Sequence, residues 1–143
     1  MIYLLDTNIV SQAMRANPKV IERLKQLEHG RVAMSAVTFA EIEYGIMRFP
    51  KGQKGRTRRR SELKALFDAL LTYVDVLPWD RAAAMPYAHT RIDCEVTGMN
   101  LDQADLMIAA HAVSSGATLV TDDAALLRRS KSSSSPKIVN WLA

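Results

Sequence analysis

The chain has 143 residues, of which 19 are Lys or Arg, 15 are Asp or Glu, and 48% are hydrophobic. This length and hydrophobic content suit one domain with its own core, and they exclude an intrinsically disordered chain. The single cysteine, Cys94, excludes an internal disulfide framework and a zinc site built on cysteine pairs. We therefore expect one globular domain over residues 1–143.

The N-terminal residues carry no signal for export or membrane insertion. Only five residues, MIYLL, precede Asp6. A secretory signal needs an apolar run of about 7–15 residues after a basic start, and a membrane span needs roughly 20. The sequence predicts a soluble cytoplasmic protein without a membrane partner.

Signals for strands and helices alternate along the chain. Short apolar runs predict strands at 2–5, 32–35, 74–77, 118–121 and 138–141. Helical spacing of apolar residues, with caps and stops at the ends, predicts helices at 18–28, 38–47, 61–71, 80–96 with a break near Pro86, and 103–115. The alternation favours an α/β fold, with a central and mostly parallel sheet of about five strands flanked by helices.

Seven basic residues and no acidic residue lie between positions 48 and 60. They are Arg48, Lys51, Lys54, Arg56, Arg58, Arg59 and Arg60. The rest of the chain carries 12 basic and 15 acidic residues, so this segment accounts for the net charge of +4. Its Gly and Pro residues predict a basic loop over 48–60, and the Ser-rich stretch 130–135 predicts a polar linker. A basic loop on an otherwise acidic domain favours a polyanionic partner, and a solvated loop without a partner is the alternative.

Acidic residues follow the predicted strands or begin the helices beside them. They are Asp6, Glu41, Asp102, Asp105, Asp122 and Asp123. Since ligand sites in open parallel sheets form beyond the carboxyl ends of the strands, these side chains are expected to converge. Taken singly, each also suits a structural role: an N-cap, a partner in the Thr38–Glu41 capping box, a charge at a helix N-terminus or a turn residue.

Converging carboxylates repel one another unless cations lie between them. Mg²⁺ prefers oxygen ligands, and two such ions about 3.5–4 Å apart promote phosphodiester cleavage. Two other chemistries fit less well. Phosphatases that form an aspartyl phosphate carry Asp-x-Asp after the first strand, where this chain has Asp6-Thr7-Asn8, and phosphoreceiver domains need an early acidic pair. An acidic centre with a basic segment is typical of a metal-dependent nuclease.

Four segments resemble a known family, the PIN-domain ribonucleases, and specifically the VapC toxins of bacterial type II toxin–antitoxin pairs. They read LLDTNIVS (4–11), SAVTFAEIEYGI (35–46), ADLMIAAHAVSSGATLVTDD (104–123) and IVNWL (138–142). They occur in the family's order and span nearly the whole chain. The stretch SKSSSSPK departs from the family, whose members more usually have an aromatic-containing segment there.

The resemblance assigns roles to individual residues. The family's catalytic and metal-binding acids fall on Asp6, Glu41, Asp105 and Asp123. Asp122 and Asp102 are secondary candidates for metal ligands. The neighbouring polar residues Thr7, Asn8 and Thr121 would orient the first Asp or a bound water.

The resemblance also implies an activity and partners. It implies an endoribonuclease that depends on Mg²⁺ or Mn²⁺ and cuts structured RNA, with tRNA, including initiator tRNA, as the expected class. The basic residues of 48–60 would hold the RNA backbone. A VapB-type antitoxin would neutralise the enzyme near its acids, with helices 18–28 and 36–49 as groove walls, and a homodimer would assemble further with antitoxin and DNA. A PIN nuclease of RNA processing and a non-catalytic RNA- or partner-binding module are the alternatives.

Overall fold

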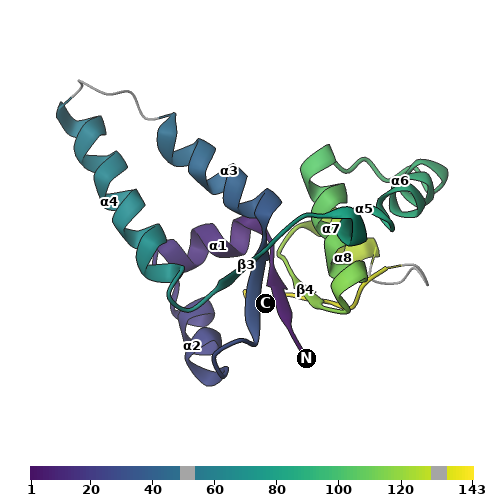
Figure 1. The fold of residues 1–143 in the computed structure, drawn as a ribbon, viewed down its shortest axis with the longest axis horizontal. Coiled ribbons are helices and arrows are strands. Elements are labelled where there is room, and N and C mark those ends of the chain that lie inside the picture. The colour runs from purple at the N-terminus through teal and green to yellow at the C-terminus, as the bar shows by residue number, and fades with distance from the viewer. Residues whose placement is uncertain (49–53, 130–134) are drawn as a thin grey trace.

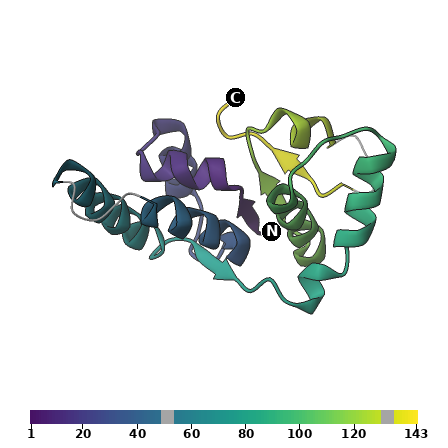
Figure 2. The same cartoon turned by 90° about the horizontal axis from the view of Figure 1, so that it is seen from above.

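The computed structural model describes residues 1–48, 54–129 and 135–143, and for residues 54–57 it describes the backbone alone. Within these ranges the chain forms an open sheet covered by helices on both faces (Figures 1 and 2). The strands are β1 (Tyr3–Leu5), β2 (Val32–Ser35), β3 (Asp75–Leu77), β4 (Thr118–Val120) and β5 (Ile138–Val139). The helices are α1 (Thr7–Met14), α2 (Pro18–Gln26), α3 (Ala36–Met47), α4 (Lys54–Leu70), α5 (Arg81–Ala84), α6 (Tyr87–Val96), α7 (Gln103–Ser115) and α8 (Ala124–Arg129).

The five strands are all parallel and follow the order β3-β2-β1-β4-β5. The chain builds outward from β1 to β3, then crosses to the other side of β1 and adds β4 and β5. The direction of winding therefore changes between β1 and β4. In open α/β sheets, the carboxyl ends of the two strands at such a switch point form the binding crevice.

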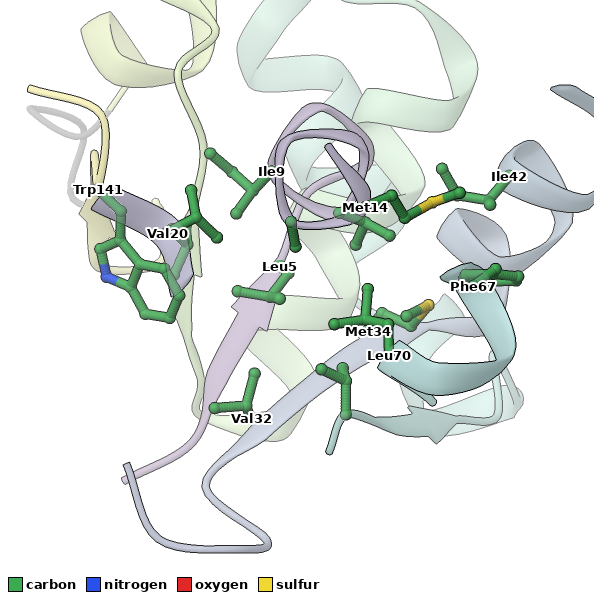
Figure 3. Close-up of a cluster of buried hydrophobic side chains, with 14 of the residues drawn as sticks. Leu5, Ile9, Met14, Val20, Val32, Met34, Ile42, Phe67, Leu70 and Trp141 are labelled. Atoms are coloured by element: carbon green, nitrogen blue, oxygen red, sulfur yellow. The ribbon is translucent and has the colours of Figure 1, made fainter. Parts of the chain in front are cut away.

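Alternate residues of the central strands enter two separate cores. Leu5 and Met34 pack with α1 and α4, and the ring of Phe67 on α4 is fully buried beside them (Figure 3). Leu4 and Leu119 face the opposite side, against α7 and α8. Burial of both sheet faces explains why these strands read as continuous apolar runs in the sequence.

The helix after β2 begins earlier than the sequence suggested. The predicted start was a capping box between Thr38 and Glu41, but α3 begins at Ala36 and its N-cap is Ser35, whose hydroxyl accepts a hydrogen bond from the backbone N–H of Val37 at 3.1 Å. Thr38 is buried inside the helix. The correction matters for the site, because Glu41 is then free of a capping role.

The predicted basic loop is shorter than 48–60. Helix α4 begins at Lys54, and residues 49–53, which include Lys51, lie outside the described residues. Arg is a good helix former, and Glu62 forms ion pairs with Arg58 and Arg59, at N–O distances of 3.3 Å and 3.5 Å. The basic run is therefore part of the helix. Most of the predicted polar linker, residues 130–134, also lies outside the described residues.

The remaining elements agree with the sequence pattern except at their ends. Pro86 separates α5 from α6, and Asp102 and Gly116 cap the two ends of α7 as predicted. The last strand ends at Val139, and Trp141 packs beyond it against Tyr3, with ring centroids 5.6 Å apart. No helix among the described residues is long and apolar enough to cross a membrane.

A substitution at Phe67 tests how strongly the packing of α4 depends on the core that contains Leu5 and Met34. Phe67→Ala should lower the free energy of unfolding by about 3–5 kcal/mol, because it removes a fully buried ring. This ring packs on that of Phe39, with ring centroids 5.4 Å apart. Leu66→Ala, one position away and 42% exposed, should cost less than about 1 kcal/mol. Urea denaturation of both variants measures the difference, and equal losses would contradict this account of the core.

Candidate active site

Asp6 stands at the carboxyl end of the central strand and is almost fully buried, at 2% exposure. Its backbone N–H donates to the carbonyl of Val120 at 2.9 Å, which extends the pairing of β1 with β4 by one residue. One carboxylate oxygen accepts from the N–H of Thr7 at 2.8 Å and caps α1. The other accepts from the hydroxyl of Thr121 at 2.7 Å. The switch point of the sheet therefore holds a fixed, inward-facing carboxylate.

Burial dominates the electrostatics of Asp6. Desolvation raises its pKa, the hydrogen bonds from Thr121 and Thr7 lower it, and the negative charges of Asp123 and Glu41 raise it further. The ionised form of Asp6 is thus stabilised in part by two hydrogen bonds and destabilised by burial and by its acidic neighbours.

Asp105 lies in the first turn of α7, where Asp102 accepts a hydrogen bond from its backbone N–H at 2.8 Å. Asp102 is therefore the N-cap, as the simpler reading predicted. The pKa of Asp105 is raised to about 7, first by desolvation and then by the charges of Asp6, Asp102 and Asp123. Asp105 is the acid at the centre of this mutual repulsion.

Glu41 reaches the site from the second turn of α3. Its carboxylate accepts a hydrogen bond from the hydroxyl of Thr7 at 2.6 Å, so the residue directly after Asp6 orients the acid contributed by another helix. Helix α3 is itself fixed to α7 where the Ser35 hydroxyl meets Nδ1 of buried His111 at 2.8 Å. This contact sets the helices that carry Glu41 and Asp105 against each other.

The two acids after β4 have different surroundings. Asp122 accepts a hydrogen bond from the side-chain amide of Asn8 at 3.2 Å. Asp123 donates its backbone N–H to Thr121 at 3.0 Å, accepts from the N–H of Leu126 at 3.0 Å, and acts electrostatically on Asp6 and Asp105. The side chain of Asn8 thus contacts Asp122, whereas the family resemblance implied that Asn8 orients Asp6 or a bound water.

The donor set fits a hard divalent cation. Among the described residues, the charged groups that raise the pKa of Asp6 and Asp105 are all carboxylates, and a cation bound between them would remove the repulsion. Separate hydrogen bonds from Thr121, Thr7 and Leu126 hold these oxygens in place. In the described part of the chain, no group of three or more acidic, His or Cys side chains is arranged to hold a metal ion as it stands.

A groove of about 400 Å³ leads away from these acids between α1, α3 and α4. Thr7 and Glu41 line it beside Arg15, Arg48 and Arg59. The described structure thus brings two of the predicted basic residues next to the site, whereas Arg58 is exposed on α4 and pairs with Glu62. Of the predicted helix 36–49, α3 (Ala36–Met47) lines this groove, and residue 49 lies outside the described residues.

The other predicted wall, helix 18–28, lines a different surface. Ile21 and Leu24 of α2 border a separate apolar hollow of about 260 Å³ with α1 and α4. Sequence reasoning also missed Arg15 as a neighbour of the site. The signal was present: Thr7, Ser11 and Arg15 are spaced i, i+4, i+8, which places them on one face of a helix.

A family model described as the PIN domain matches residues 3–131. The chain belongs to the PIN-domain family. The PIN-domain fold predicted from the sequence is confirmed, with an all-parallel sheet in place of a mostly parallel one.

Several relatives of this PIN-domain chain are named VapC. Ribonuclease VapC1 from Haemophilus influenzae (strain R2866) is 34% identical over 85% of this chain and 86% of its own length. The tRNA(fMet)-specific endonuclease VapC from Shigella flexneri is 30% identical, with coverage of 85% and 86%. Among solved structures, VapBC-1 from nontypeable Haemophilus influenzae matches the whole chain with a TM-score of 0.78 and 26% identity. The resemblance to VapC ribonucleases is confirmed.

The raised pKa of Asp105 predicts a pH-dependent stability of the metal-free PIN domain. The folded state holds this proton up to about pH 7, whereas the unfolded chain releases it near 3.8, so stability falls as the pH rises through this window. Asp105→Asn removes the effect, so its stability relative to the wild type should rise between pH 4 and pH 8. We expect a gain of about 1–2 kcal/mol, since the carboxyl is part-exposed and its charge is screened.

Urea denaturation in EDTA across this pH range measures the effect. Asp75→Asn, on the exposed edge strand, is the matched control and should follow the wild type. A constant difference between Asp105→Asn and the wild type at every pH would contradict the assignment.

Proposed function

We propose that this protein is a Mg²⁺- or Mn²⁺-dependent endoribonuclease of the VapC type, acting as the toxin of a toxin–antitoxin pair. The proposal is carried by one observation: Asp6, Asp105 and Asp123 act on one another electrostatically, and Glu41 acts on Asp6, at the switch point of the sheet. The names of the VapC relatives support the reaction class, phosphodiester hydrolysis in RNA.

Asp6, Glu41 and Asp105 are the proposed metal ligands, and Asp123 completes the site. A divalent cation held by these acids would supply a polarised water and neutralise charge on the scissile phosphate. Thr121 and Thr7 keep the oxygens of Asp6 and Glu41 in fixed directions, which lowers the cost of ordering them when the cation binds. Asp105 would hold the cation in its ionised form, so the proton that desolvation and the charges of Asp6, Asp102 and Asp123 favour on this carboxyl would pass to solvent.

The basic residues of segment 48–60 are the proposed contacts to the RNA backbone. They are Arg48, Lys51, Lys54, Arg56, Arg58, Arg59 and Arg60. Their positive charge balances the repulsion between the phosphates and the acidic site. Structured RNA, with tRNA as the expected class, is the proposed substrate, and the Shigella flexneri relative, named a tRNA(fMet)-specific endonuclease, supports this choice.

We further propose a homodimer that is inhibited by a VapB-type antitoxin and that joins a larger assembly with antitoxin and DNA. The similarity to the VapBC-1 structure supports the antitoxin as a partner. The cytoplasm, the compartment of the proposed RNA substrate, is the proposed location.

Replacing the central acid tests the proposed chemistry. Asp6→Asn should lower the single-turnover rate of RNA cleavage in Mg²⁺ by at least about 100-fold, because it removes a negative ligand. The fold should remain, since Asn is also a good N-cap and a buried charge is lost. Asp75→Asn is the control. EDTA should abolish wild-type cleavage, and a wild-type rate in Asp6→Asn would reject the assigned centre.

The two acids after β4 should differ in effect. Asp123→Asn should lower the cleavage rate more than the affinity for Mg²⁺, and less severely than Asp6→Asn, because Asp123 lies beside the other acids without anchoring the cation. Asp122→Asn should be close to neutral, since its partner is Asn8. Single-turnover cleavage across a Mg²⁺ titration separates rate from affinity. A large loss in Asp122→Asn with a near-normal Asp123→Asn would exchange their roles.

A further inference from the structure

The groove beside the acids runs along α1 and α3. On both helices, the residue near the acids comes before the arginine in the chain. On α1, Thr7 lies at the acidic end and Arg15 follows the last helical residue, roughly 12 Å further along the axis. On α3, Glu41 lies at the acidic end and Arg48 follows the last helical residue, roughly 10 Å away. The groove thus passes from carboxylates at one end to guanidinium groups at the other.

The arginines at the far end come from three separate helices. Arg15 and Arg48 follow α1 and α3, and Arg59 belongs to the N-terminal part of α4, which lies alongside α3 in a projecting pair (Figure 1). Arg59 pairs with Glu62 at 3.5 Å, and both side chains are 48% exposed, so this ion pair is weak and open to exchange. Guanidinium groups bind phosphate oxygens through two parallel hydrogen bonds. Their gathering favours an extended polyanion over a single small anion.

Gly45 lies in the wall of the groove, in the last turn of α3. Its backbone does not have positive φ, and a Cβ built there would meet no atom within 4 Å. Neither backbone geometry nor packing therefore requires glycine, although glycine is a poor helix former. A side chain at this position would project into the groove between Glu41 and Arg48. Gly45 therefore leaves the groove unobstructed.

We propose that this groove carries the RNA backbone away from the scissile phosphate, with Arg15, Arg48 and Arg59 as its phosphate contacts and Gly45 as the position that keeps it open. This inference rests on the proposed ribonuclease function and adds the path of the strand. The occupant is single-stranded RNA next to the cut. The scissile phosphate lies near the proposed cation at Glu41. The neighbouring phosphates of the strand lie at the arginines.

The first experiment fills the groove without unfolding the protein. Gly45→Ala should raise Tm by about 3 °C through helix propensity and leave RNA affinity within about twofold. Gly45→Leu should keep the wild-type Tm or exceed it, yet weaken RNA binding and cleavage by about tenfold or more. Hydrolysis of bis(p-nitrophenyl) phosphate, which needs the acids and no groove, should be unchanged in both variants.

The second experiment counts phosphate contacts. Binding of a fluorescent single-stranded RNA across a salt series, in Ca²⁺ to slow cleavage, should show a slope that falls by about 0.7 for each of Arg15→Ala, Arg48→Ala and Arg59→Ala. Arg31→Ala is the matched control, because Arg31 is an exposed arginine at the start of β2, at the opposite edge of the sheet. Its slope should equal that of the wild type.

The outcomes separate the inference from the function on which it rests. Wild-type protein that cleaves neither substrate in Mg²⁺ rejects the ribonuclease function. Wild-type cleavage with unchanged RNA affinity in Gly45→Leu and Arg15→Ala rejects the RNA path. In that case, loss of a protein partner's binding in the same variants would assign the groove to that partner.

Discussion

Asp6 places a negative charge at the carboxyl end of the central strand, where desolvation opposes ionisation and two further acids repel it. The structure holds this charge through hydrogen bonds from Thr7 and Thr121, one from the helix that follows β1 and one from the end of β4. The site therefore depends on the pairing of β1 with β4. A shift of one residue in that pairing would separate Thr121 from Asp6 and turn the acid out of the crevice.

Fold stability and site chemistry oppose each other at this point. Asp105, with its pKa raised to about 7, destabilises the metal-free protein at neutral pH, and no described basic side chain is among the charges that shift it. The hydrophobic cores on both sheet faces supply the stability that allows such a centre. The contact of Ser35 with His111 then joins the start of α3 to α7, the helices that carry Glu41 and Asp105.

Charge is divided between the two ends of one groove. Carboxylates lie where the sheet ends, and arginines lie where α1 and α3 end. This division follows from helix length: eight residues of α1 span the distance between the acidic and basic ends. An all-acidic crevice would repel RNA, whereas a basic surface some distance from the acids attracts the backbone and leaves the metal site intact.

The sequence by itself determined the α/β architecture and most candidate acids, since apolar runs, caps and strand-end positions are local signals. These signals singled out six candidate acids, and the family resemblance selected Asp6, Glu41, Asp105 and Asp123 among them. Local signals also predicted Asp102 as a cap and the break at Pro86. Tertiary structure decided what local signals cannot encode. Ser35 replaced Thr38 as the cap because α3 starts directly at the strand end, and Asn8 was assigned to Asp122 by the approach of the corner after β4 to α1. Gly45 and Arg59 joined Arg15 in one groove only when α1, α3 and α4 packed together, because positions far apart in sequence acquire a common groove through packing alone, whereas the i, i+4, i+8 spacing already placed Arg15 on the helix face of Thr7.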